Sequence, residues 1–216
     1  MKAHDDQTQV RIEVQGQEIT PVHGLLREGV HTRVHLGTSV QQVLTQDLHI
    51  PQERVDQDVQ SIFLNGHPVD DMRTLIRAEG SVLTLSAAMP GLVGACMRRD
   101  GAYAQLRESI SWQEERADEE EVHLGSIRVK LFNLMVPVLG PILLRHGVLV
   151  QGHRLRDVLA SVQGSGWVSS VQINGQDPRS QVGGAPGELD TEDMLWVQVI
   201  PGSWSYVPDN QGESQG

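Results

Sequence analysis

The stretch Leu25-Leu26-Arg27-Glu28-Gly29-Val30 recurs almost unchanged as Leu143-Leu144-Arg145-His146-Gly147-Val148. Further matches follow in the same order along the chain, each at the same point in a pattern of apolar and turn residues. One short match can arise by chance, but several in order predict an internal repeat of one fold. The further matched sites are Gly37 with Gly152, Asn65-Gly66 with Asn174-Gly175, and Met89-Pro90-Gly91 with Ile200-Pro201-Gly202.

Each copy carries the same order of predicted elements, namely two strands, a helix and two strands. The first copy opens with Val10, Ile12 and Val14, which alternate with polar residues as in a strand with one buried face. Its other elements are predicted over 30–36, 38–48 (the helix), 62–64 and 82–85. The second copy has predicted strands over 127–131, 147–151, 168–173 and 194–200 and a helix over 153–162.

We expect the first two strands of each copy to form a hairpin. The first and last strands would pair in parallel through a right-handed crossover, with the helix across one face of the sheet. In the first copy Thr38 is predicted to cap the helix, with Gln41 as its capping-box partner. The helix would bury an apolar stripe formed by Val40, Val43, Leu44 and Leu48.

The predicted fold class is α+β, with two tandem domains of this kind joined by an amphipathic helical connector. A chain of 216 residues suits two small domains with one core each. Between the copies, apolar residues at helical spacing around Leu106 predict the connecting helix, and the acidic run over 114–121 predicts a solvated linker. The predicted boundaries are 8–91 for the first domain, 92–124 for the connector and linker, 125–202 for the second domain, and 203–216 for a flexible tail.

The charge balance argues against nucleic acid as a partner. The chain has 17 basic and 28 acidic residues, for a net charge of −11. Such a chain has no electrostatic basis for holding a phosphate backbone.

The longest apolar run, 131–144, is too short for a bilayer, so no membrane partner is expected. The first residues lack the apolar core of a secretory signal. A lone Cys96 cannot form an intramolecular disulfide, which favours a reducing compartment. The predicted location is cytoplasmic.

The order of elements resembles that of the β-grasp sulfur carriers, namely the small subunit of molybdopterin synthase and the thiamine sulfur carrier, and more distantly ubiquitin. The resemblance depends on the opening strand Ile127–Phe132, on Val158-Leu159 after the helix start, and on the Asn-Gly pairs at 65–66 and 174–175. It spans both copies and implies two tandem β-grasp domains.

Those carriers end in a flexible Gly-Gly tail whose carboxylate is converted to a thiocarboxylate. Here the corresponding segments, Met89-Pro90-Gly91 and Pro201-Gly202, are each followed by more chain. The resemblance therefore implies carrier or modifier chemistry only if proteolysis exposes a terminal glycine. This is the alternative function, and the tail segments are its candidate sites.

Other motifs favour ordinary structural explanations. His31 and His35 share one strand face but stand about 13 Å apart along a strand, too far to bind one metal ion without other ligands. Cys96 has no histidine or second cysteine near it in sequence, and the glycine-rich stretch 183–187 lacks the Lys-Ser/Thr of a phosphate-binding loop. No catalytic residue, cofactor or metal ligand is predicted, and the protein is not expected to be an enzyme.

The most unusual stretch follows the opening strand of the second copy, where nearly every residue is apolar. A strand with one wet face should alternate, so this predicted hairpin must be covered on both sides. An internal domain interface and an oligomer or partner surface remain equally open explanations. The candidate interface residues are Phe132, Leu134, Met135, Val136, Val138 and Leu139.

The predicted function is therefore that of a non-catalytic protein-binding or assembly module. Its partner would be another protein or a second copy of the chain, bound through the apolar second hairpin. A third possibility is a small-ligand pocket between the copies, for which the sequence shows no specific residues.

Overall fold

The computed structural model describes residues 7–15, 22–87, 121–132, 134–177, 189 and 192–201. The predicted connecting helix, Cys96, the stretch 183–187, Met89-Pro90-Gly91, Gly202 and the tail 203–216 lie outside them. The elements, in chain order, are β1 (Gln9–Val14), α1 (His23–Arg27), β2 (Val30–Leu36), β3 (Thr38–Ser39), α2 (Val40–Gln42), the π-helix η3 (Val43–Asp47), α3 (Gln52–Asp58), β4 (Ser61–Leu64), β5 (His67–Pro68), β6 (Leu75–Ile76), β7 (Val82–Ser86), β8 (His123–Phe132), α5 (Met135–His146), β9 (Val148–Gln151), α6 (Gly152–Ser161), β10 (Val168–Ile173) and β11 (Met194–Pro201).

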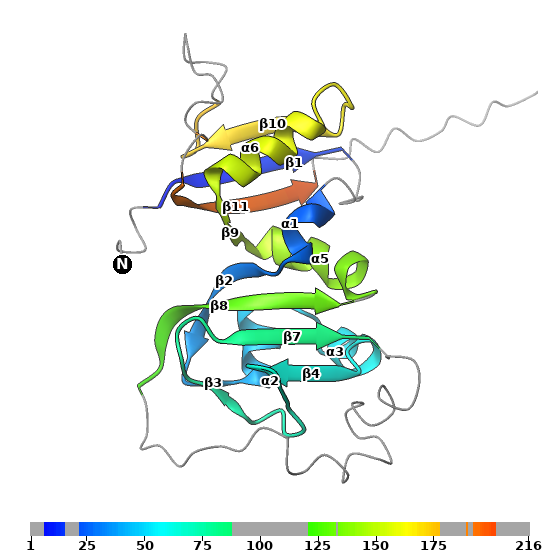
Figure 1. Ribbon diagram of the computed structural model, residues 1–216, viewed down its shortest axis with the longest axis vertical. Helices are drawn as coiled ribbons and strands as arrows, with labels where there is room; N and C mark the ends of the chain where they lie inside the picture. Colours follow the sequence, from blue (N-terminus) through cyan, green and yellow to red (C-terminus); the bar gives the residue numbers. More distant parts are fainter. Residues whose placement is uncertain are drawn as a thin grey trace, which may run out of the picture.

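The structure is α+β. Within the described residues, nine strands form one mixed sheet in the order β10-β1-β11-β9-β2-β8-β7-β4-β5 (Figure 1). The strands β9 and β2 pair at one position only, His31 with Leu149. We call this junction the seam. It divides the sheet into an upper half-sheet (β10, β1, β11, β9) and a lower half-sheet (β2, β8, β7, β4, β5).

The two opening strands are exchanged between the copies. Strand β8, from the second copy, lies between β2 and β7 of the first, and strand β1, from the first copy, lies between β10 and β11 of the second. The expected parallel pairing occurs, but it joins β8 to β7 and β1 to β11. The predicted pairing within each copy was therefore wrong, as were the predicted hairpins, because β2 pairs with β8 and not with β1.

The alternating pattern explains why the partner could not be predicted. Both opening strands bury every second residue, Val10, Ile12 and Val14 in β1 as well as Ile127 and Val129 in β8. Alternation fixes which face of a strand is buried. It does not specify which of two similar closing strands lies beside it.

The two half-sheets share one internal pattern, antiparallel, parallel, antiparallel. The series β2-β8-β7-β4 in the lower half-sheet corresponds to β9-β11-β1-β10 in the upper one. The Asn-Gly turns show the same correspondence. The Asn65 side chain accepts a hydrogen bond from Val82 N at 2.8 Å, and the Asn174 side chain accepts one from Gln9 N at 2.9 Å. Strand β1 thus takes, beside β10, the place that β7 takes beside β4.

The predicted Asn-Gly turns are confirmed. Asn65 and Gly66 have φ values of 51° and 87°, and Asn174 and Gly175 have 50° and 78°. Asparagine and glycine tolerate this left-handed region, which a tight turn between antiparallel strands requires.

The repeated stretch forms the same local structure twice. In each copy a helix ends, a glycine with positive φ follows, and a strand begins; φ is 86° at Gly29 and 125° at Gly147. A Cβ on Gly147 would lie 2.1 Å from the Trp196 ring, and one on Gly29 would lie 2.6 Å from the Lys130 side chain. Glycine is needed at both sites because the backbone turns there and passes close to a neighbouring side chain.

The first helix matches its predicted buried stripe but not its predicted cap. Val40, Val43, Leu44 and Leu48 are fully buried. The capping box forms one residue later than predicted, between Ser39 and Gln42, whose backbone N donates to Ser39 Oγ at 3.2 Å. Thr38 Oγ1 instead donates to the His35 carbonyl.

The apolar stretch after β8 is a helix, so the predicted second hairpin was wrong. Helix α5 packs against α1, β8 and β11, between the two half-sheets (Figure 1). Its buried residues Met135, Leu139 and Leu143 recur every fourth position, as one face of a helix does. Val136 and Val138 are partly buried, whereas Phe132 and Leu134 are 52% and 69% exposed. Most of the candidate interface is thus internal packing.

We expect Gly147→Ala to destabilise the protein by about 2 to 5 kcal/mol, from an unfavourable φ and from overlap with Trp196. Gly66→Ala is a matched control, because Gly66 also has positive φ but has open space around its Cα. It should cost only about 1 kcal/mol. Urea unfolding of both variants measures the difference, and equal losses would contradict the packing at Gly147.

Candidate functional site

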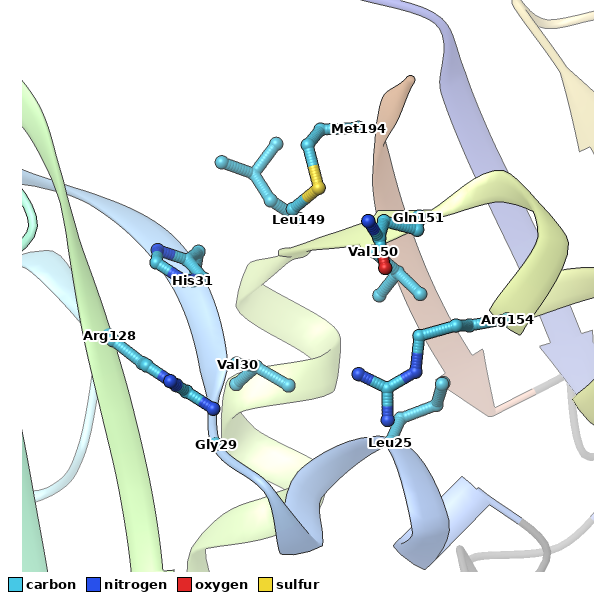
Figure 2. A pocket seen from close by; sticks show the side chains of 10 residues that line it. All are labelled: Leu25, Gly29, Val30, His31, Arg128, Leu149, Val150, Gln151, Arg154 and Met194. Carbon is cyan, nitrogen blue, oxygen red and sulfur yellow. The ribbon is translucent and has the colours of Figure 1, made fainter. Parts of the chain in front are cut away.

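A cavity of about 240 Å³ opens at the seam, where both half-sheets contribute residues (Figure 2). We call it the seam cavity. Apolar side chains and three basic ones share its wall. The lining residues are Leu25, Gly29, Val30, His31, Arg128, Leu149, Val150, Gln151, Arg154 and Met194.

Strand register brings His31 and Arg128 together. They are direct partners across the antiparallel pair β2 and β8. Because Ile127 and Val129 point into the core, Arg128 projects from the opposite face of β8, beside His31. Arg154 approaches from α6, on the other side of the cavity (Figure 2). The three basic side chains therefore come from three different elements.

Arg128 carries a charge that no carboxylate among the described residues pairs with. One guanidinium nitrogen donates to the backbone carbonyl of Glu28. Its Nε is buried and has no hydrogen-bond partner in the described part of the chain. A guanidinium has five donors, and a buried donor without a partner is costly. Arg128 is thus suited to bind an additional acceptor.

Arg154 is paired, but with an exposed group. Its guanidinium lies 3.0 Å from the Glu28 carboxylate, and the two side chains are 36% and 67% exposed. Glu28 therefore contacts Arg154 through its side chain and Arg128 through its backbone. Glu28, the residue directly after α1, therefore holds both arginines beside the cavity.

His31 lines the cavity in its neutral form at pH 7. Burial lowers its pKa below the usual 6.5, and the nearby charge of Arg128 lowers it further, while Glu79 acts in the opposite direction. A neutral imidazole can accept one hydrogen bond and donate another. His31 adds polarity to the cavity wall without adding charge.

A second cluster lies at the seam around His146, which stands in the repeat where the first copy has Glu28. Its ring centroid is 5.7 Å from that of His49 and 5.9 Å from Trp196, edge to face. The Arg33 guanidinium lies over the same Trp196 ring, 4.5 Å from its centroid. These contacts join β2 and the loop after η3 of the first copy to α5 and β11 of the second. Arg33–Trp196 has the geometry of a cation–π pair.

The His146 pKa is lowered mainly by burial. The backbone carbonyl of Arg33, 3.4 Å from Nε2, acts in the opposite direction, the neighbouring His49 lowers the pKa further, and Asp47 raises it. Asp47 itself accepts from His35 through both the ring Nδ1, at 2.7 Å, and the backbone N, at 2.9 Å. His35 is thus engaged by Asp47, whereas His31 lies in the cavity.

The described residues contain no group of three or more His, Cys, Asp or Glu side chains placed to hold a metal ion. None of the described helices is both long and apolar enough to cross a membrane. Pro201 ends β11 and is exposed. The other tail residues, Met89, Pro90, Gly91 and Gly202, lie outside the described residues, so the carrier hypothesis stays a prediction.

The sequence did not predict the cavity, because Arg128 and Arg154 look like ordinary exposed residues of a strand and a helix. One signal was present. The two copies of the repeated stretch differ in a single residue, Glu28 in the first and His146 in the second. Both residues lie at the seam.

Acidification should destabilise the protein through His31 and His146. Their pKa values are lowered on folding, so below pH 6.5 the unfolded chain binds protons that the folded protein resists. Above pH 6.5 both histidines are neutral in the folded and the unfolded chain, and the free energy of unfolding is unaffected by their titration. It falls as the pH drops from 6.5 through the lower folded pKa values. Urea unfolding between pH 8 and 5 measures this loss.

The variant His146→Phe keeps a ring against Trp196 but cannot bind a proton. It should reduce the dependence of unfolding free energy on pH. An unchanged dependence would show that His146 does not contribute.

Comparison of the chain with protein-family models, with curated proteins and with solved structures gives no match.

Proposed function

We propose that the protein is a non-catalytic binding module built from two β-grasp halves, and that it binds a small organic anion in the seam cavity. The observation that carries this proposal is the unbalanced charge of Arg128 in the cavity wall.

The β-grasp part of the proposal is supported by the lower half-sheet. There the helix formed by α2 and η3 packs on β2, and the parallel strands β7 and β8 lie in the middle of the half-sheet. This is the arrangement expected of a β-grasp domain, with β8 as its opening strand. The upper half-sheet has the same pattern of parallel and antiparallel pairs, with the places of the opening and closing strands exchanged, since β11 lies beside β9 and β1 lies beside β10.

The charge in the cavity favours an anionic ligand group. Arg128 and Arg154 supply two positive charges, and the carboxylate of Glu28 balances one of them. Guanidinium groups bind carboxylate and phosphate oxygens through paired hydrogen bonds. The preferred ligand group is therefore an oxyanion.

The rest of the lining favours a short apolar body. Leu149, Val150 and Met194 contribute apolar walls, and Gln151 offers an amide. Drug-sized ligands occupy about 300 to 1,000 Å³, so a cavity of about 240 Å³ suits a smaller molecule. A short-chain carboxylate or phosphate ester fits these requirements.

The proposal is non-catalytic because of the side chains that face the ligand. None of the ten lining residues is Ser, Thr, Cys, Lys, Asp or Glu, so the imidazole of His31 is the one possible base or nucleophile in the wall, with no lining carboxylate to orient it. Arginines bind and orient an anion without exchanging protons with it.

Arg128→Gln should weaken butanoate binding about tenfold or more, because a hydrogen bond to a charged group contributes about 1.5 to 3 kcal/mol. Arg154→Gln should weaken it as well. Arg54→Gln is the control, since Arg54 lies on α3 and pairs with Asp58 away from the cavity. The dissociation constants are measured by NMR titration, in which the backbone amide signals of Gly29 and Leu149 report binding. If wild type and Arg128→Gln bind equally, the cavity is not the site.

Self-association is a second candidate, favoured by the exposure of Phe132 and Leu134 at the end of β8 and the start of α5. If these side chains form a contact between two copies, Leu134→Asp will convert an oligomer to a folded monomer in light scattering. The buried Leu139 is the matched comparison, and Leu139→Asp should unfold the chain by leaving a buried charge unpaired. A wild-type monomer would rule out this candidate.

A further inference from the structure

Glu28 is placed to compete with a ligand for Arg154, one of the arginines that line the cavity. Its carboxylate lies 3.0 Å from the Arg154 guanidinium, while its backbone carbonyl accepts from Arg128. The side chain is a carboxylate on a short apolar stem, the same chemistry that the cavity favours in a ligand. Thus a carboxylate of the chain already contacts one of the two arginines that line the cavity.

We propose that Glu28 is a built-in competitor, which the oxyanion of a bound ligand displaces from Arg154. This inference rests on the proposed function of the seam cavity. It assigns Glu28 a regulatory role, because a ligand must bind Arg154 more tightly than Glu28 does in order to replace it.

The exposure of the pair makes displacement feasible. The Glu28 side chain is 67% exposed and can turn into solvent, where its charge is hydrated. Ion pairs at such positions contribute little to stability, so breaking this one costs little. The Arg128 contact uses the Glu28 backbone and need not break when the side chain leaves. Arg128 therefore stays in place while Arg154 changes partner.

Displacement would also change which elements are tied together. In the absence of ligand, the Glu28–Arg154 pair joins the end of α1 to α6. A ligand held by both arginines would join β8 of the lower half-sheet to α6, beside the upper one. Because the half-sheets pair at only one position, His31 with Leu149, such a bridge would reinforce the seam.

The test compares two substitutions that each remove one negative charge near α6. Glu28→Gln removes the proposed competitor. Glu192→Gln removes a carboxylate that lies 3.5 Å from His153, the residue next to Arg154, and that does not line the cavity. Binding of butanoate and, separately, of inorganic phosphate is followed on the full chain by the amide signals of Gly29 and Leu149.

We expect Glu28→Gln to bind the probe about twofold to fivefold more tightly than wild type, in keeping with the small contribution of an exposed ion pair. Glu192→Gln should change affinity less than twofold at 0.15 M salt, where separated surface charges are screened. The probe that shows the gain identifies the oxyanion as carboxylate or phosphate. Tighter binding by Glu28→Gln when wild type binds neither probe would also support the proposal.

Unchanged or weaker binding by Glu28→Gln would overturn the competitor role, because Glu28 would then be neutral or would help to orient Arg154. An equal gain in Glu192→Gln would overturn it too, by showing a general effect of charge. These outcomes leave the binding site itself intact if Arg128→Gln still weakens binding. If neither wild type nor Glu28→Gln binds either probe, the site and the competitor role both fail.

Discussion

The parallel pairing of each opening strand with a closing strand of the other copy is the interaction on which the rest of the structure depends. Because β8 lies beside β7, and β1 beside β11, neither half-sheet can be completed by one copy alone. The helices that follow the opening strands, α1 and α5, therefore pack together between the two half-sheets. There α5 buries its apolar face, which the sequence pattern had assigned to a hairpin.

The same exchange creates the seam and its chemistry. Where the half-sheets meet, β2 and β9 pair only at His31 and Leu149. A longer series of pairs between these two strands would close the space that forms the cavity. Glu28 and His146, the single difference between the repeated stretches, both lie there. One copy contributes a carboxylate at the arginines, and the other contributes a half-buried imidazole beside Trp196. The two repeated stretches thus form the same local structure, and the single difference between them, Glu28 or His146, gives them different contacts at the seam.

Features set by local sequence could be predicted. The Asn-Gly turns and the buried stripe from Val40 to Leu48 depend on neighbours in sequence, and both were found where expected. The strand partners could not be predicted, because β1 and β8 have the same alternation. Helix α5 was mistaken for a strand since it is apolar on nearly every side. The cavity joins residues as distant in sequence as Leu25 and Met194, and it exists only after the exchange.

Disulfide formation tests the exchange most directly, in a Cys96→Ser background. Thr84 and Lys130 are partners across β7 and β8, and neighbouring strands lie about 4.8 Å apart, within disulfide range. Thr84→Cys with Lys130→Cys should therefore form a disulfide within one chain under mild oxidation, detected by peptide mass. Thr84→Cys with Glu13→Cys, the pair expected if β1 lay beside β7, should not. Efficient closure of the second pair within one chain, without the first, would contradict the exchanged arrangement.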